Sequence, residues 1–412
     1  MGEMVYARYL LNGDPVERAR LRRAANEDVF GVQIATNDVG EGVAAMRLAR
    51  EAGADFVDLN CGCPIHEATR RGLGSALLRN PKRCEAEPSD GDTLPVHSTD
   101  KTFPPSTHRL GELVRGLVDG GVDIPLTVKV RLGTSNRDIN VLEVAEEMVG
   151  AGAAGLTVHG RSAQERYSSA ANWAMIKEVV ERVDSRIPVV GNGDVLTFDG
   201  GIRRIETAGV DSVMVGRGAL ETPWVFDEGG WEPDTKERVE VYRRLACYMK
   251  EHFGDDGRGR KMASYFFPWH FEFFCRHSPG KESMQSRLSD MDTNPPPLES
   301  LLACRDQRAH KRIAGILWDS RDDGDAVTKL TELAESAVMG EIRRGVKEED
   351  GEGGVEELSN IPGEDKRARK RRAPKPKRTE MEVEKIRAER KAKREAAGIT
   401  DFKHVSGKRR GS

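Results

Sequence analysis

Side chains able to do chemistry recur where short apolar runs of this sequence end. In chain order the runs end in Gln33 (GVQI), Asn60 to Pro64 (VDLNCGCP), Lys129 and Arg131 (TVKVRLG), His159 (TVHGR), Asn192 to Asp194 (VVGNGD) and Gly216 to Gly218 (MVGRGAL). Any one group is common as an ordinary hydrogen-bonded structural residue, but six in succession favour a shared site. Lys129 and His159 are the most informative, because long polar side chains beside an apolar strand must find partners and a bound anion would supply them.

The last two groups have the composition of a phosphate site. Backbone N–H groups of the NGD and GRG loops, together with Arg217, can surround a phosphate. Parallel barrels build such a site from the loops after strands seven and eight. The pattern therefore predicts a phosphorylated cofactor.

These groups need a scaffold that brings strand ends together. Apolar runs alternate with amphipathic stretches from residue 30 to 220, which is typical of repeated βα units and predicts an α/β fold with a parallel sheet. In a parallel barrel, functional residues collect at the carboxyl ends of the strands. The expected strands are 30–34, 56–59, 126–130, 155–159, 187–190 and 212–215, with a seventh at 4–10.

Three regions follow along the chain. We expect a barrel at 1–226 with a disordered insertion at 85–106, and a helical domain at 227–344 with helices at 235–253, 260–277, 307–318 and 326–344. A charged low-complexity tail occupies 345–412, and its segment 366–378 has nine Lys or Arg in thirteen positions. Nuclear localisation, nonspecific RNA contact and a merely solvated tail are all compatible with that segment.

Composition narrows the class of protein. The 412 residues are 32% charged and 37% hydrophobic with a mean hydropathy of -0.58, and they contain no run of about 18 apolar residues. The start lacks a secretory signal, so we expect a soluble cytoplasmic or nuclear protein. The six cysteines show no metal-ligand spacing, so we expect reduced thiols and no bound metal.

The segment DLNCGCPIHEATRRGLGSALLRNP resembles the signature of tRNA-dihydrouridine synthases. The similarity continues in order through VQI, TVKVRLG, TVHGRSAQERYSSAANW, VVGNGDV and VGRGALETPWVF. GVQI, HGRSAQERY and FFCRHSP are similar to the eukaryotic branch that modifies position 47 of tRNA. The resemblance implies a (β/α)8 TIM barrel, a helical tRNA-binding domain and reduction of uridine to dihydrouridine with FMN as cofactor and NADPH as electron donor.

The same resemblance implies roles for individual residues. Cys63 matches the catalytic cysteine, which gives a proton to C5 of the uracil. Asn60 and Arg131 match residues near the uracil. Because cationic surface must hold the RNA backbone, Arg70, Arg71, Arg161 and the helical domain are the candidate RNA contacts. The implied FMN contacts are Gln33, Lys129, His159, Asn192, Gly193, Gly216 and Arg217.

The chain also departs from the family pattern. Family members begin with an Ala-Pro-Met strand and a helix, whereas this chain starts at the segment after them, so we expect seven strands, two unpaired sheet edges and weak FMN binding. A noncatalytic RNA-binding remnant and another FMN-dependent barrel oxidoreductase are the alternatives. The flavin content of the purified protein separates the first alternative, and substrate choice separates the second.

Deleting residues 366–412 is expected to leave the thermal unfolding transition unchanged, because a segment this charged buries little apolar surface. Circular dichroism on the full and shortened chains measures this. Loss of the transition in the shortened chain would show that the tail belongs to the folded core.

Overall fold

The computed structural model describes residues 1–79, 106–165, 169–277, 295–337 and 339–340. The insertion expected at 85–106 lies outside the described residues up to residue 105, and the tail expected at 345–412 lies outside them entirely. Helix α5 (Ser106–Val118) begins directly after the insertion.

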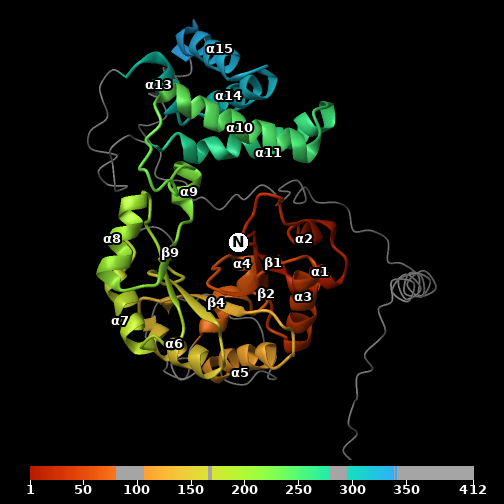
Figure 1. Ribbon diagram of the computed structural model, residues 1–412, viewed down its shortest axis with the longest axis vertical. Helices are drawn as coiled ribbons and strands as arrows, with labels where there is room; N and C mark the ends of the chain where they lie inside the picture. The colour runs from red at the N-terminus through yellow and green to blue at the C-terminus, as the bar shows by residue number, and fades with distance from the viewer. Residues whose placement is uncertain (80–105, 166–168, 278–294, 338, 341–412) are drawn as a thin grey trace, which may run out of the picture. The chain divides into compact units, whose positions relative to one another are not determined.

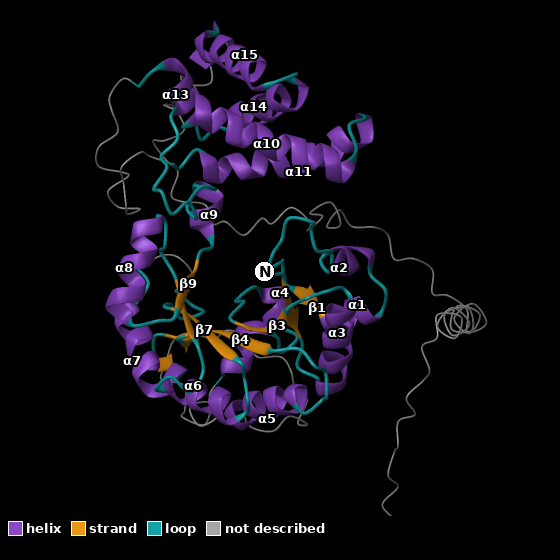
Figure 2. Ribbon diagram, viewed as in Figure 1, coloured by secondary structure: helices purple, strands orange, loops and turns teal. Residues whose placement is uncertain are grey.

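A single parallel sheet of seven strands organises the N-terminal half of the chain (Figures 1 and 2). Its order is β1-β2-β3-β4-β7-β8-β9, which follows the chain. The strands are β1 (Val5–Tyr6), β2 (Gly31–Ala35), β3 (Phe56–Cys61), β4 (Leu126–Arg131), β7 (Gly155–His159), β8 (Val189–Asn192) and β9 (Ser212–Met214). The six strands expected between residues 30 and 215 are confirmed.

The expected strand at 4–10 is wrong in length. Only β1 is extended there, and helix α1 (Ala7–Leu11) follows it at once. The buried residues of α1 are Ala7 and Leu10, a helical spacing that turns one face inward. Within the described residues, β1 and β9 each pair with one strand only, so the expectation of two open edges is confirmed.

Helices follow the strands and pack along the outer side of the sheet (Figure 1). They are α3 (Val39–Glu51), α5, α6 (Val141–Gly150), α7 (Trp173–Val183) and α8 (Phe198–Ala208). Side chains fix where three of them begin, because Asp38, Asn172 and Thr197 each accept a backbone N–H of the first turn. Shorter elements line the loops: α2 (Pro15–Ala19), α4 (His66–Thr69), η1 (Gly74–Leu78), the hairpin of β5 (Gly133–Ser135) and β6 (Asp138–Ile139), and α9 (Arg217–Glu221).

A second hydrophobic core lies in the helices after residue 224. These are α10 (Thr235–Phe253), α11 (Gly257–Phe274), α13 (Pro297–Leu302), α14 (Gln307–Asp319) and α15 (Asp323–Glu335). Tyr242 stacks on Phe274 at its centre, with ring centroids 4.2 Å apart. The helix expected at 326–344 begins earlier and ends earlier, because Asp322 caps the first turn of α15 and Ser336 turns to extended backbone. No helix of the described residues is both long enough and apolar enough to cross a membrane.

Strand alternation separates two chemical faces of the sheet. Successive side chains of a strand point to opposite faces, so apolar Val57, Leu59 and Cys61 of β3 pack in the core with the helices. The residues between them are polar, and the parallel register aligns them with polar residues of neighbouring strands. This inner polar face consists of Gln33, Asp58, Asn60, Thr127, Lys129, Arg131, Thr157 and His159.

Candidate active site

The loop after β3 carries Cys63 and is held at three points. Asn60 Oδ1 accepts the backbone N–H of Gly62 at 3.2 Å and that of Cys63 at 2.9 Å. Arg131 Nε donates to the carbonyl of Gly62 at 2.8 Å, and the N–H of Ser75 donates to the carbonyl of Cys63 at 2.9 Å. These bonds fix the position of the thiol relative to β3 and β4.

Gly74 is required where its backbone passes this loop. Its φ is +60°, and a Cβ there would lie 2.5 Å from the carbonyl oxygen of Cys63. Only glycine tolerates both the left-handed backbone and the close approach. Gly74 therefore allows the start of η1 to pack against the backbone of Cys63.

The two neighbouring cysteines differ in environment. Cys61 is fully buried in the hydrophobic core, and burial raises the pKa of its thiol well above the usual value. Cys63 is half-buried, and burial also raises the pKa of its thiol, against the opposing effects of the Ile65 backbone and the Arg131 and Lys129 cations. Cys63 is therefore the accessible thiol of the pair, and it is protonated at neutral pH.

A buried carboxylate, Asp58, lies beside this loop and was not among the residues that we expected in the site. It is 1% exposed and accepts two hydrogen bonds, from Thr127 Oγ1 at 2.7 Å and from Gln33 Nε2 at 2.8 Å. Gln33 Oε1 in turn accepts from Asn60 Nδ2 at 2.7 Å. The signal that could have found Asp58 is strand alternation, since it stands two residues before Asn60 on the same face.

Lys129 on β4 is paired in register with Asn60. Burial lowers the pKa of its ammonium group to about 8, although the nearby Asp58 carboxylate opposes that shift. The group therefore titrates close to physiological pH. A lysine in this position can bind an anion and can also lose its proton.

His159 stays neutral under physiological conditions. Burial, followed by the cations Arg131, Lys129, Arg161 and Arg217, lowers the pKa of its imidazole to about 2. Nη1 of Arg161 lies 3.3 Å from Nε2 of His159, and because a guanidinium only donates, this nitrogen accepts and Nδ1 carries the hydrogen. The imidazole of His159 can therefore donate a hydrogen bond to a ligand, but it carries no positive charge.

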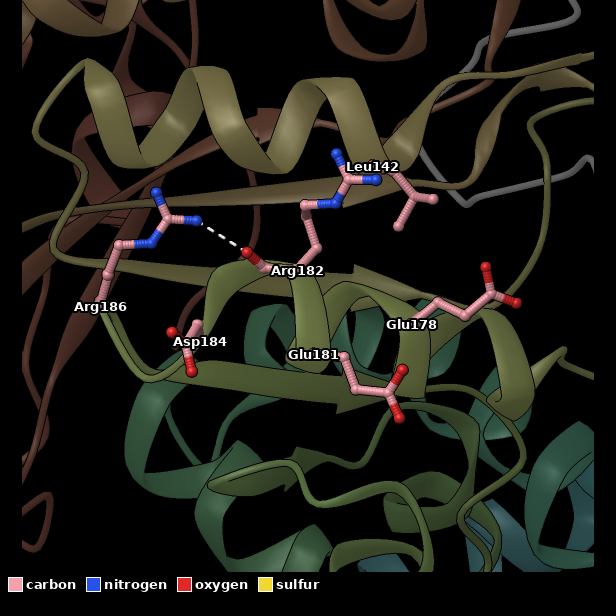
Figure 3. Close-up of a pocket in the computed structure, with 6 residues that line it drawn as sticks. All are labelled: Leu142, Glu178, Glu181, Arg182, Asp184 and Arg186. Atoms are coloured by element: carbon pink, nitrogen blue, oxygen red, sulfur yellow. Dashed lines mark hydrogen bonds between the residues drawn. The ribbon is translucent and has the colours of Figure 1, made fainter.

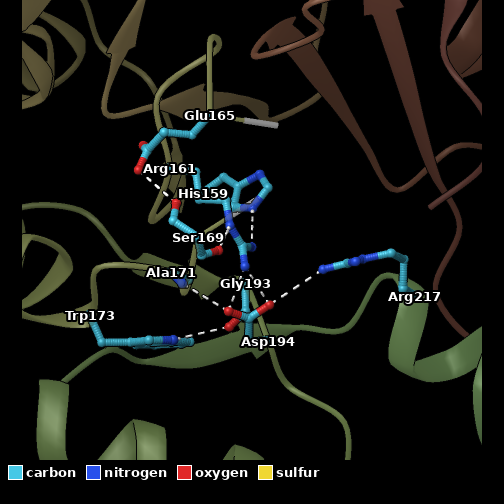
Figure 4. Close-up of polar contacts among 9 residues, drawn as sticks. All are labelled: His159, Arg161, Glu165, Ser169, Ala171, Trp173, Gly193, Asp194 and Arg217. Carbon is cyan, nitrogen blue, oxygen red and sulfur yellow. Dashed lines mark hydrogen bonds and ion pairs between the residues drawn. The ribbon is translucent and has the colours of Figure 1, made fainter. Parts of the chain in front are cut away.

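Asp194 joins two arginines at the ends of β7 and β9 (Figure 4). Nη2 of Arg161 lies 2.7 and 2.6 Å from the two oxygens of Asp194, and Nη2 of Arg217 lies 3.3 Å from Oδ1. The N–H of Ala171 also donates to Asp194, at 2.8 Å. Asp194 was part of a predicted strand end, but its carboxylate was given no role.

Arg161, a candidate RNA contact, is buried. It is 2% exposed, and besides Asp194 it donates from Nε to the carbonyl of Ser169 at 2.7 Å (Figure 4). Likewise Arg131 is 5% exposed and donates to the carbonyls of Gly62 and Ser162. Both arginines hold loops together at the strand ends.

The remaining predicted residues are Asn192, Gly193 and Gly216, which lie at or after the ends of β8 and β9. Asn192 donates to the carbonyl of Met214 at 2.8 Å, which joins β8 to β9. Gly193 has a φ of +127°, and a Cβ there would lie 2.6 Å from the Cβ of Ala171. Beside Gly216 a Cβ would meet no heavy atom within 4 Å, so space is open next to Arg217. The structure therefore brings every predicted site residue to the carboxyl ends of the strands.

A separate surface hollow of about 480 Å³ lies away from these residues (Figure 3). Leu142 and the α7 side chains Glu178, Glu181 and Arg182 line it, together with Asp184 and Arg186 after the helix. Arg186, one of the lining residues, also forms an exposed ion pair with Glu146 at 3.0 Å. The hollow contains none of the predicted site residues.

Replacing Asp194 with alanine is expected to lower the free energy of unfolding by about 3–5 kcal/mol, because it removes one partner of a buried ion pair with Arg161. Chemical denaturation measures this. Glu146→Ala is the matched control, since it removes an exposed pair and should change stability little. Equal effects of the two substitutions would contradict a structural role for Asp194.

Comparison with known proteins identifies the family. The model described as dihydrouridine synthase (Dus) matches residues 1–86 and 107–296. A Homo sapiens protein named tRNA-dihydrouridine(47) synthase (NAD(P)(+))-like is 33% identical over 330 residues, which cover 77% of this chain and 46% of the human protein. A Malassezia globosa tRNA-dihydrouridine(47) synthase is 32% identical, with coverage of 73% and 40%.

The chain thus spans less than half the length of these curated relatives. Among solved structures, a mandelate oxidase is 22% identical with a TM-score of 0.29, covering 46% of this chain and 49% of that chain, and so loose a superposition supports no inference. The match to the family model instead covers most of the described residues, including every strand of the parallel sheet. The chain belongs to the dihydrouridine synthase family.

Proposed function

We propose that this chain reduces a uridine of tRNA to 5,6-dihydrouridine, with FMN as cofactor and NADPH as electron donor. The observation that carries the proposal is the Cys63 thiol, accessible, protonated and fixed beside Lys129 at the strand ends. Membership of the dihydrouridine synthase family supports the reaction, and the names of the relatives support position 47 and a nicotinamide reductant. An RNA-binding remnant would have no need of this thiol.

The donors at the strand ends fit FMN. Four cations act on His159, namely Lys129, Arg131, Arg161 and Arg217, and Asp194 pairs with two of them, Arg161 and Arg217. Cations of this kind suit a phosphate monoester, and the open space beside Gly216 gives it room next to Arg217. In our proposal Arg217, Asn192 and Gly193 hold the phosphate end, while Gln33, Lys129 and His159 contact the ring system.

The chain's own residues then supply what the reaction needs around the flavin. Bound FMN, once reduced, supplies the hydride that C6 of the uracil accepts. Cys63 supplies the proton to C5, and its raised pKa keeps that proton available at neutral pH. Asn60 uses one amide hydrogen on Gln33, and we propose that its second amide hydrogen binds a uracil carbonyl.

The target base must leave the folded tRNA to reach Cys63. In our proposal the nearby Arg70 and Arg71 contact the RNA, since both are partly exposed. Cζ of Arg71 also lies 5.0 Å from the ring centroid of Tyr9. The guanidinium and the ring together offer a cationic and aromatic surface to the RNA. Arg131 and Arg161 also hold the loops at the strand ends, and in our proposal Arg131 lies near the uracil and Arg161 contacts the RNA.

Cys63→Ala is expected to lower the rate of uridine reduction by about 10²–10⁴-fold while FMN still binds, because the substitution removes only the proton donor. Turnover on tRNA and bound flavin per chain are the two measurements. Cys61→Ala is the matched control and should retain turnover, since that thiol is buried in the core. Near-normal turnover of Cys63→Ala would exclude this residue as the acid.

FMN affinity is expected to fall by about tenfold per pH unit above the Lys129 pKa of about 8, because the ammonium loses the charge that attracts an anion. The charged and titratable groups facing Lys129 are Asp58, Arg131 and Cys63, and the thiol titrates at higher pH. Flavin fluorescence titrations from pH 7 to pH 9 measure the effect. Lys129→Met should bind weakly at every pH, and a pH-independent affinity in the parent chain would refute the prediction.

A further inference from the structure

We propose that Asp58 is a positioning residue that sets the direction of a hydrogen-bond chain ending at Cys63. The proposal rests on the proposed function, because the position of Cys63 matters to activity only if this thiol is the acid. The chain runs through side chains of two adjacent strands, from Asp58 to Gln33 to Asn60, and then to the backbone of the Cys63 loop.

The direction of this chain follows from which atoms can only accept. Burial raises the pKa of the Asp58 carboxyl, whereas the hydrogen bonds from Gln33 and Thr127 and the Lys129 cation favour the ionised form. The ionised carboxylate has no hydrogen to donate, so the amide of Gln33 must turn its Nε2 toward Asp58, at 2.8 Å. Its Oε1 then faces Asn60 and accepts from Nδ2 at 2.7 Å. That bond leaves Asn60 Oδ1 as the acceptor for the N–H groups of Gly62 and Cys63.

Reversal of any amide in the chain would place like groups against each other. If Gln33 were flipped, its Nε2 would face Nδ2 of Asn60, and a flip of Asn60 would then set Nδ2 against two backbone N–H groups. Buried donors without acceptors are costly, and Gln33, Asp58 and Asn60 are 7%, 1% and 9% exposed. Because Asp58 accepts at one end of the chain, it fixes the orientation of the side-chain amides of Gln33 and Asn60.

The Asp58 carboxylate accepts its hydrogen bonds from side chains of neighbouring strands. Both of its oxygens are used inside the sheet, one by Gln33 and the other by Thr127 Oγ1 at 2.7 Å. The carboxylate is buried and lies behind Gln33 and Asn60, so it positions groups that contact ligands instead of contacting a ligand itself. Its effect on chemistry passes through Cys63.

The test compares Asp58→Leu with Asp58→Asn in the full chain. Both variants remove the negative charge and keep the branch at Cγ, but asparagine can still accept from Gln33 through Oδ1 while its Nδ2 donates to the hydroxyl of Thr127. The readout is the rate at which iodoacetamide alkylates Cys63 at pH 8, followed by mass spectrometry of the Cys63 peptide. Circular dichroism establishes that each variant is folded.

Asp58→Leu is expected to be alkylated about tenfold faster at Cys63 than Asp58→Asn, because the loop loses its fixed acceptor and opens more often. Asp58→Asn should retain the slow labelling of the parent chain, and Cys61 should stay protected in all variants. Equal labelling of the two folded variants would overturn the proposal, since only asparagine keeps an acceptor for Gln33.

A second variant covers the case in which Asp58→Leu does not fold. Gln33→Leu interrupts the same chain one link further on, so it should also accelerate alkylation of Cys63, and labelling at the parent rate would overturn the proposal. Because alkylation does not require turnover, its outcome is separate from that of the proposed function. Fast labelling of Asp58→Leu, together with a parent chain that fails to reduce uridine, would leave the positioning role intact and refute the reaction.

Discussion

Alternation of side chains along parallel strands is the constraint on which this site depends. Because neighbouring strands run in register, one face of β2, β3, β4 and β7 carries polar residues in line, while the other face packs on helices. A polar inner face would be costly if its groups were unpaired. Side-chain hydrogen bonds between the strands offset that cost, and they also fix the orientation of the side chains near the strand ends.

Two carboxylates hold the two sides of the site in place. Asp58 accepts hydrogen bonds from Gln33 and Thr127 and so orders the side of Cys63. Asp194 pairs with Arg161 and Arg217 and so orders the side where we place the phosphate. The site also holds Lys129 and neutral His159, and burial and neighbouring cations lower the pKa values of both side chains. It thus combines fixed acceptors with several buried cations.

Prediction from the sequence worked best where local patterns decide the outcome. Apolar runs located six strands, and their polar ends located every predicted site residue at one edge of the sheet. It was wrong at 4–10, where the helical spacing of Ala7 and Leu10 prevails over an apparent strand. It could not show that Arg161 pairs with a carboxylate 33 positions away, because that contact depends on how the chain folds.

The sequence by itself determined the order of the elements, the polar strand ends and the family, because these follow from composition and spacing along the chain. Only the tertiary structure decided which cysteine is accessible, that His159 is neutral, and that Asp58 directs Gln33 and Asn60. These properties depend on burial and on distances between residues that are far apart in sequence. Hydrogen-bond direction and pKa are set by such neighbours, and the fold alone brings them together.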